Sequence, residues 1–297
     1  MCHSQPCFCN DIYRAQLTEG FSDDAAGYIS GSLLDAGSDS TASTLYGFIL
    51  AMLIWPDIQK RGQEEVDRVV GQDRLPIMED YDQLPFVRCC IKETLRWMPT
   101  VVLGVPHNVT KDDSYLGYQI PKDSTIINNV WSVLGMLSTP QSPHLIVPTR
   151  AIHMDETRSP EPRVFNPDRF KDIPSTLYQS VIGDVAKRDN FVFGAGRRLC
   201  QGIHIAERSL FLAISRFFWG FNFLPAKDEH GNPVQYDAED LVGGITVQPA
   251  DFPAVIEARS KRRADIIRKE AQESEKSLDP ETLQWIKVPE GMVFNNE

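Results

Sequence analysis

The sequence predicts a mainly α fold with small β-sheets, and three observations support this prediction. Apolar side chains recur at intervals of three and four residues over 203–218, which is the spacing of one helix face. The stretch 22–53 suits one long helix, because Ser22 followed by two aspartates is typical of a helix N-terminus. The extended segments are short, and residues 115–121 resemble a hairpin. With 297 residues, 42% of them hydrophobic, the chain can bury a core in one or two domains.

Two more helices are expected after the long one. The first begins at Pro56 and runs towards Gly71, with strongly charged side chains on one face. The second ends at Trp97, because Pro99 cannot continue a helix. Residues 101–105 then predict a strand, and residues 126–131 predict a continuation of the small sheet.

Charge and cysteine usage exclude some classes of function. The formal net charge is −11 and the isoelectric point is about 5.1, which argues against nucleic acid as a partner, because that needs a basic face. The six cysteines show no zinc spacing, so a reduced, intracellular setting is favoured. Residues 1–21 are interpreted as a disordered tail rather than a metal site, because no second ligand cluster accompanies them. The longest apolar run, 45–55, is too short to cross a bilayer.

The chemistry-bearing stretch is Phe-Gly-Ala-Gly-Arg-Arg-Leu-Cys-Gln-Gly at residues 193–202. Cys200 lies just before a predicted helix, where the helix dipole favours a thiolate over a thiol. Gly196 and Gly202 lack Cβ atoms, so the backbone can approach a large flat group, and Arg198 suits a carboxylate. Together these features describe a haem iron held by an axial cysteine. The alternative is a buried, inert cysteine beside a turn.

The stretch 193–202 resembles the haem-binding loop of the cytochrome P450s, the haem-thiolate monooxygenases. The resemblance covers about residues 22–260 and implies the C-terminal portion of that fold: a long oxygen-binding helix, a Glu-x-x-Arg helix, the Cys loop and a final helix. It implies haem b as cofactor, with Cys200 as the metal ligand. The implied cofactor-binding residues are Phe193, Gly196, Arg198, Cys200, Gly202 and His107, where an ordinary surface histidine is the alternative for the last.

Residues 34–41 interrupt the long helix with glycine and hydroxyl side chains, which are poor helix formers. Alone they suggest a small-residue groove for helix packing. They also resemble the family motif Ala-Gly-x-Asp-Thr-Thr, where the helix bulges over the haem and binds O2. That resemblance makes Asp39, Ser40 and Thr41 the catalytic residues that relay protons. Ser40 stands where the family has threonine, and its hydroxyl is less restrained at χ1.

The Glu-x-x-Arg pair places Glu93 and Arg96 on one helix face. By resemblance, this pair joins Arg169 in a buried charge network that braces the Cys loop structurally and does no chemistry. Residues 243–247 resemble the family's final hairpin, whose turn enters the substrate pocket.

Two regions depart from the family pattern. Residues 132–150 are expected to be translated intron sequence or a surface insertion, because so long a structureless loop is unusual in a compact domain. Residues 261–297 are expected to be a charged, solvated helical tail. The N-terminal half of the family's fold has no counterpart in the sequence, so residues 22–260 are interpreted as a truncated monooxygenase domain.

The function implied is monooxygenation of an apolar small molecule with O2, typical of fungal secondary metabolism, and the alternative is a non-catalytic remnant that does not bind haem stably. Electrons would come from an NADPH-dependent flavin reductase. Its docking surface would be a basic patch of Lys187, Arg188 and Arg197. The alternative is that these three are scattered, solvated charges. The family implies an endoplasmic-reticulum membrane location, although no anchor is recognised in the sequence.

Overall fold

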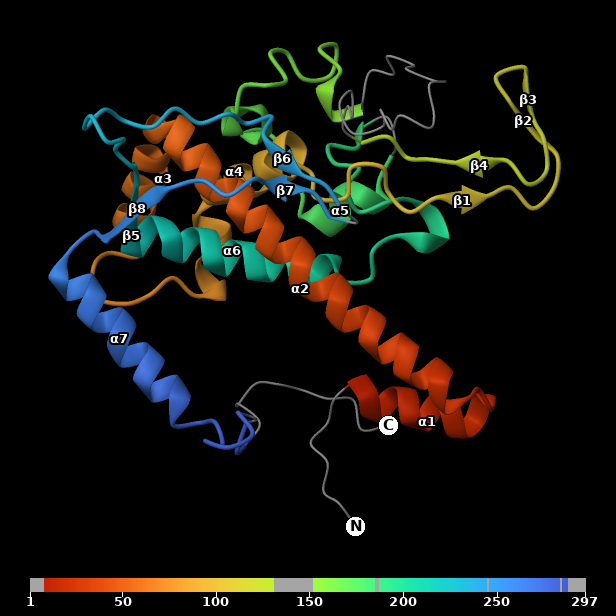
Figure 1. Cartoon of the computed structure of the whole chain (residues 1–297), viewed down its shortest axis with the longest axis horizontal. Helices are drawn as coiled ribbons and strands as arrows, with labels where there is room; N and C mark the ends of the chain where they lie inside the picture. Colours follow the sequence, from red (N-terminus) through yellow and green to blue (C-terminus); the bar gives the residue numbers. More distant parts are fainter. Residues whose placement is uncertain (1–7, 131–151, 185–186, 245, 284, 288–297) are drawn as a thin grey trace.

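The computed structural model describes residues 8–130, 152–184, 187–244, 246–283 and 285–287 (Figure 1). It confirms a mainly helical chain with small sheets. The α-helices are α1 (Phe8–Glu19), α2 (Asp23–Ile54), α3 (Pro56–Val69), α4 (Pro85–Trp97), α5 (Leu177–Ile182), α6 (Ile203–Gly220) and α7 (Lys261–Glu275). Short 3-10 helices are η1 (Met78–Gln83), η2 (Ile152–Met154), η3 (Pro167–Phe170) and η5 (Gly196–Arg198). The strands are β1 (His107–Asn108), β2 (Asp113–Tyr115), β3 (Tyr118–Ile120), β4 (Thr125–Ile126), β5 (Phe221–Pro225), β6 (Leu241–Val242), β7 (Gln248–Pro249) and β8 (Ala254–Ala258).

The core lies where α2, α3, α4 and α6 pack together. Phe48 of α2 meets Phe218 of α6 edge to face, with ring centroids 5.4 Å apart. Helix α3 approaches α6 closely at Gly62, because a Cβ atom there would overlap the ring of Phe218. Gln59 of α3 also exchanges two hydrogen bonds with the backbone of Phe223, which ties the strand after α6 to the same core.

Helix α2 begins where the sequence predicts. The Ser22 hydroxyl accepts a hydrogen bond from the amide of Ala25 at 3.2 Å, and Asp23 and Asp24 fill the first turn. Such a cap stabilises a helix by about 1 kcal/mol. Within the described ranges, no single helix has the length and apolar content of a membrane span. Helices α2 and α3 would qualify only together, and they meet at a bend of 108°.

The expected disordered tail is wrong for the residues that form α1. This helix packs beside the first turns of α2, where Gln16 donates a hydrogen bond to Asp23 at 2.6 Å (Figure 1). None of its residues is fully buried. An amphipathic pattern with that little burial is hard to distinguish from a disordered polar segment.

Among the described residues, the strands form two-stranded antiparallel pairs: β1 with β4, β2 with β3, β5 with β8 and β6 with β7. The hairpin expected at 115–121 is confirmed, since Tyr115 pairs with Tyr118. Its two turn residues, Leu116 and Gly117, have φ of 51° and 85°, as a tight hairpin requires. The hairpin expected at 243–247 connects β6 to β7.

The strand expected at residues 101–105 is wrong. The backbone turns there, because Gly104 adopts a φ of 61° and Pro106 follows it. The segment instead serves as a junction, since the carbonyl of Val102 accepts the amide of Val130 at 2.9 Å. The extended structure lies further on, in β1, and β4 ends at Ile126, so residues 127–130 do not continue the sheet as expected.

Of the C-terminal segment expected to be a solvated helical tail, residues 261–275 form α7, and Arg263 in its first turn is buried rather than solvated. Arg263 is 4% exposed and lies 5.1 Å from the ring centroid of Trp219. Asp67 of α3 accepts hydrogen bonds from Arg259 at 2.6 Å and from Arg263 at 2.7 Å. These contacts fasten the start of α7, and the rest of the helix extends away from the body (Figure 1). Residues 132–150, expected to be an insertion, lie outside the described residues.

Candidate functional site

The Cys loop, residues 193–202, is a tight, internally bonded turn in front of α6. Gly194 and Gly196 have φ of 76° and 62°, which residues with a Cβ rarely adopt. The amide of Cys200 donates to the carbonyl of Phe193 at 2.9 Å, and the amide of Leu199 donates to Gly196 at 3.2 Å. The loop thus presents Cys200 three residues before Ile203, the first residue of α6.

The Cys200 side chain is exposed, so the interpretation as a buried, inert cysteine is wrong. A Cβ atom on Gly202 would lie 3.8 Å from the sulfur, in ordinary van der Waals contact with it. A Cβ atom on Gly196 would meet no atom within 4 Å, which leaves that side open. An accessible thiol at a helix N-terminus, between two glycines, fits the proximal face of a haem.

The residues expected to hold the haem carboxylates are available for that role. Arg198 lies in η5 and His107 lies in β1, and both side chains are exposed. Within the part of the chain that is described, neither forms an ion pair. Phe193 is half-buried and packs against the core beneath the loop.

Asp39, Ser40 and Thr41 lie on α2, with Asp39 exposed and the two hydroxyl residues half-buried. The expected bulge is not observed, because α2 is a continuous α-helix over Asp23–Ile54. The hydroxyl of Ser40 donates to the carbonyl of Ala36 at 2.8 Å, so it bonds back to the helix without opening it. In the described ranges, no hydrogen bond joins these three residues to the Cys loop.

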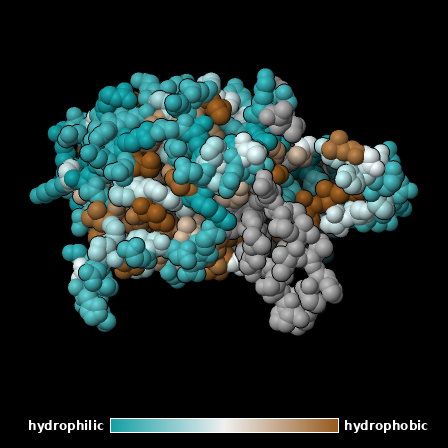
Figure 2. Space-filling view, turned by 90° about the horizontal axis from the view of Figure 1, so that it is seen from above, coloured by the Kyte–Doolittle hydropathy of each residue, from teal (hydrophilic) through white to brown (hydrophobic). Residues whose placement is uncertain are grey.

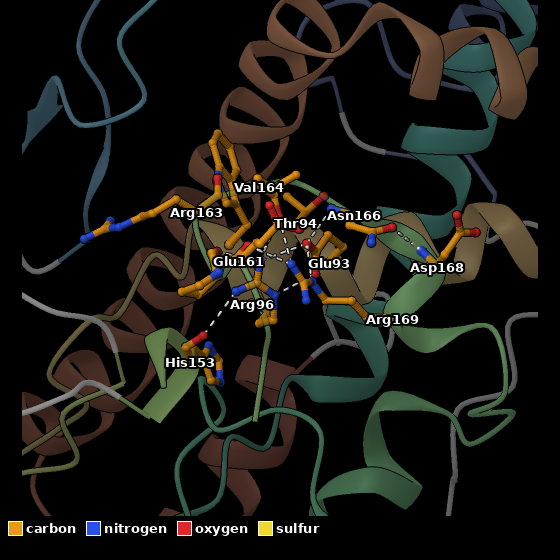
Figure 3. Close-up of polar contacts among 12 residues, drawn as sticks. Glu93, Thr94, Arg96, His153, Glu161, Arg163, Val164, Asn166, Asp168 and Arg169 are labelled. Atoms are coloured by element: carbon orange, nitrogen blue, oxygen red, sulfur yellow. Dashed lines mark hydrogen bonds and ion pairs between the residues drawn. The ribbon is translucent and has the colours of Figure 1, made fainter. Parts of the chain in front are cut away.

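The structure brings Glu93, Arg96 and Arg169 together (Figure 3). Arg96 grips both oxygens of Glu93, at 2.7 and 2.8 Å, and the two side chains are 3% and 0% exposed. Arg169 reaches Glu93 at 3.4 Å, and the amide of Asn166 donates to the same carboxylate at 2.7 Å. A single carboxylate of α4 therefore organises the segment around η3.

Arg96 extends this network towards the Cys loop through His153, a residue that the sequence interpretation does not single out. One guanidinium nitrogen of Arg96 donates to the carbonyl of His153 at 3.1 Å (Figure 3). The Nε2 atom of His153 accepts the amide of Phe191 at 3.0 Å, two residues before the loop. The neutral ring therefore carries its proton on Nδ1, which is buried and has no described partner.

Burial is the main reason that the pKa of His153 falls from 6.5 to about 3, and the nearby charge of Arg96 lowers it further. Below pH 6.5 the unfolded chain binds a proton that the folded chain does not. The free energy of unfolding is therefore not reduced by this residue above pH 6.5, and it decreases as the pH falls from 6.5 towards 3. We expect the free energy of unfolding to drop by about 2 kcal/mol between pH 7 and pH 5 from this residue.

His153→Gln keeps a hydrogen-bond acceptor but cannot titrate, so it should flatten that pH dependence in urea denaturation. The matched control is His204→Gln, which removes an exposed histidine of α6 and leaves the contacts of His153 in place. Equal slopes for His153→Gln and the unmutated chain would contradict the assignment.

The prediction of a basic surface patch is wrong for one of its three residues, Arg188. Arg188 is 4% exposed and turns inward, where its guanidinium donates to the carbonyls of Asn190 and Gly194. Desolvation lowers its pKa, as expected for a cation taken out of water. Lys187 and Arg197 remain exposed. Arg188 is therefore an internal support of the Cys loop rather than part of a docking surface.

Comparisons with known proteins give one consistent result. The family model described as Cytochrome P450 matches residues 5–136 and 133–249. The chain is 48% identical over 295 residues to cytochrome P450 monooxygenase virE of Hypocrea virens, covering 99% of this chain and 50% of that protein. It is 45% identical to cytochrome P450 monooxygenase fogE of Aspergillus ruber, covering 99% and 51%.

Among solved structures, a zebra fish cytochrome P450 with abiraterone superposes with a TM-score of 0.62 at 27% identity. That match covers 80% of this chain and 48% of the zebra fish chain. The chain spans about half the length of the curated relatives it matches.

Proposed function

This chain belongs to the cytochrome P450 family, and we propose that it carries the haem-thiolate site of a monooxygenase acting on an apolar small molecule. In the overall reaction one oxygen atom of O2 enters the substrate and the other leaves as water, with two electrons and two protons supplied. Because the chain is similar to fungal members of the family, we propose that the substrate belongs to a secondary-metabolite pathway.

The observation that carries this proposal is the geometry around Cys200. Its thiol is exposed at the end of a turn built on two left-handed glycines, at the N-terminus of an 18-residue helix. Cysteine is a residue type that ligates haem iron, and this one lies where its sulfur is open to a ligand. When haem b is bound at a cysteine thiolate, it supplies O2 activation.

Other residues of the chain orient the cofactor and handle protons. Arg198 and His107 would pair with the two haem carboxylates, because both are exposed cationic or titratable side chains. Asp39, Ser40 and Thr41 would pass protons from solvent, since Asp39 is exposed and the two hydroxyl residues follow it directly in the helix.

The remaining assignments concern partners. The electrons would come from an NADPH-dependent flavin reductase, and Lys187 and Arg197 are the exposed cations beside the Cys loop that could meet its acidic surface. Association with the endoplasmic-reticulum membrane is proposed from the family alone.

A second candidate is a non-catalytic remnant that does not retain haem. It is favoured by the first half of α2, where the large side chains of Tyr28 and Leu34 are 79% and 71% exposed. The space-filling view also shows hydrophobic side chains on the surface, including the arm that carries β2 and β3 (Figure 2). Exposed apolar residues on and beside that arm include Val105, Leu116, Ile126 and Ile127.

One spectroscopic experiment separates the two candidates. The 297-residue chain is expressed with a haem precursor, purified, reduced and treated with carbon monoxide. We expect the strongly red-shifted Soret band that thiolate-ligated haem iron gives with carbon monoxide. A chain that folds, as judged by circular dichroism, yet takes up no haem would support the remnant and overturn the monooxygenase proposal.

A further inference from the structure

Helix α4 makes a second buried ion pair, next to Glu93 in sequence, that binds a different segment of the chain. Lys92 places its Nζ atom 2.8 Å from a carboxylate oxygen of Asp189, and the two side chains are 4% and 5% exposed. Their separation in sequence is 97 residues. Glu93, the next residue on α4, bonds instead to the segment around η3. Adjacent residues of one helix therefore hold two different segments.

Both charges of this pair are satisfied by further groups. The Lys92 ammonium also lies 3.3 Å from the hydroxyl of Ser175 and 3.4 Å from the carbonyl of Ile173. The second oxygen of Asp189 accepts the hydroxyl of Ser180, from α5. A fully bonded buried pair fixes direction and distance, although its net contribution to stability is small.

Asp189 begins the segment that leads into the Cys loop. Its neighbour Arg188 donates to the carbonyl of Gly194, inside the loop. Its other neighbour, Asn190, accepts the amide of Val192 at 2.9 Å. The next residue, Phe193, receives the amide of Cys200. An unbroken series of contacts thus runs from Lys92 to the backbone of the cysteine.

We propose that Lys92 and Asp189 are positioning residues that fix the Cys loop from its N-terminal side, independently of the Glu93 network. Only the purpose of this positioning, which is to place the sulfur for haem iron, rests on the proposed function. The mechanical part, immobilisation of residues 190–200, holds for the chain without cofactor.

The first test is hydrogen exchange measured by mass spectrometry on the full chain without haem. Lys92→Met removes the cation and keeps most of the side-chain volume, which leaves Asp189 buried and unpaired. We expect exchange in peptides covering residues 190–200 to become at least about 30-fold faster, while peptides of α7 keep their rates. The amides of Gly194, Leu199 and Cys200, which donate to the carbonyls of Phe191, Gly196 and Phe193, should account for the change.

A matched control is Arg61→Met. Arg61 also forms a two-bond ion pair with Asp168, but these two side chains are 44% and 45% exposed, and in the described ranges neither forms a hydrogen bond or ion pair with the loop. This variant should leave exchange at residues 190–200 unchanged. If Lys92→Met does not fold, Ser180→Ala removes only the hydroxyl that donates to Asp189 and should still accelerate the same peptides, by a smaller factor.

Unchanged exchange at residues 190–200 in a folded Lys92→Met chain, or equal acceleration in every element, would overturn the proposal. The second readout uses the chain with haem. There Lys92→Met should lower the fraction of the red-shifted carbon monoxide band more than it lowers total bound haem, because the sulfur is misplaced. If the unmutated chain binds no haem, the proposed function fails, but the exchange result still decides the positioning role.

Discussion

Glu93→Gln is expected to lower the free energy of unfolding by about 3–5 kcal/mol, which is the effect of removing one partner of a buried ion pair. Glu93 is 0% exposed, and its two oxygens receive hydrogen bonds from Arg96, Arg169 and the amide of Asn166. Glutamine matches its shape but cannot neutralise two guanidinium groups. Arg96 would then remain 3% exposed without a counter-charge.

Because domains of this size have only about 5–15 kcal/mol of stability, this variant should unfold at a markedly lower urea concentration. The measurement is the urea midpoint followed by circular dichroism. Asp168→Asn is the matched control, since its pair with Arg61 is about half exposed and should be worth about 1 kcal/mol or less. A midpoint for Glu93→Gln equal to that of Asp168→Asn would show that the network is not a brace.

The long helices could be predicted from the sequence because their signals are local. Ser22 with two aspartates marks the start of α2, Pro56 marks the start of α3, and the interval of three and four residues marks α6. The Cys loop could be predicted for the same reason. Its glycines and cysteine are close together in the chain, and the left-handed backbone of the glycines depends on residue type.

The contacts that hold the loop could not be predicted in the same way. Arg188 is one of several basic residues near residue 190, and only the fold shows that it turns inward while Lys187 stays exposed. Lys92 pairs with a residue 97 positions away, and His153 bonds to Arg96 and Phe191, which are distant from it and from each other in the sequence. Charge patterns carry no information about such distant partners, so a surface position was the default interpretation.

Two secondary-structure errors have a related cause. Residues 101–105 have the β-branched composition of a strand, but among the described residues no strand pairs with them, and Gly104 turns the backbone. Helix α1 shows the opposite case, in which a weak apolar face becomes helical because α2 lies beside it. Tertiary context overrides local preference in both segments.

Cys200→Ser is expected to abolish the red-shifted Soret band completely. Haem binding should weaken by more than about 100-fold, because loss of even an outer-shell contact at a metal site costs about 10–100-fold in affinity. The serine hydroxyl is nearly isosteric but does not ionise near neutral pH, so it cannot supply the thiolate. Because Cys200 is exposed and its amide, not its side chain, bonds to Phe193, the substitution should leave the folded structure intact. Circular dichroism and the urea midpoint check that condition.

Two further variants identify the sulfur as the axial ligand rather than a bystander. Cys200→His retains a metal-binding side chain, so it should recover part of the bound haem, but its carbon monoxide complex should lack the red shift that only a thiolate gives. Cys9→Ser alters the other exposed cysteine in the described residues, on α1, and should change neither quantity. Cys89 and Cys90 are poor alternatives, because desolvation raises the pKa of both thiols and opposes thiolate formation. A red-shifted band that persists in Cys200→Ser would therefore require another thiolate ligand and would remove the structural basis for assigning haem to this loop.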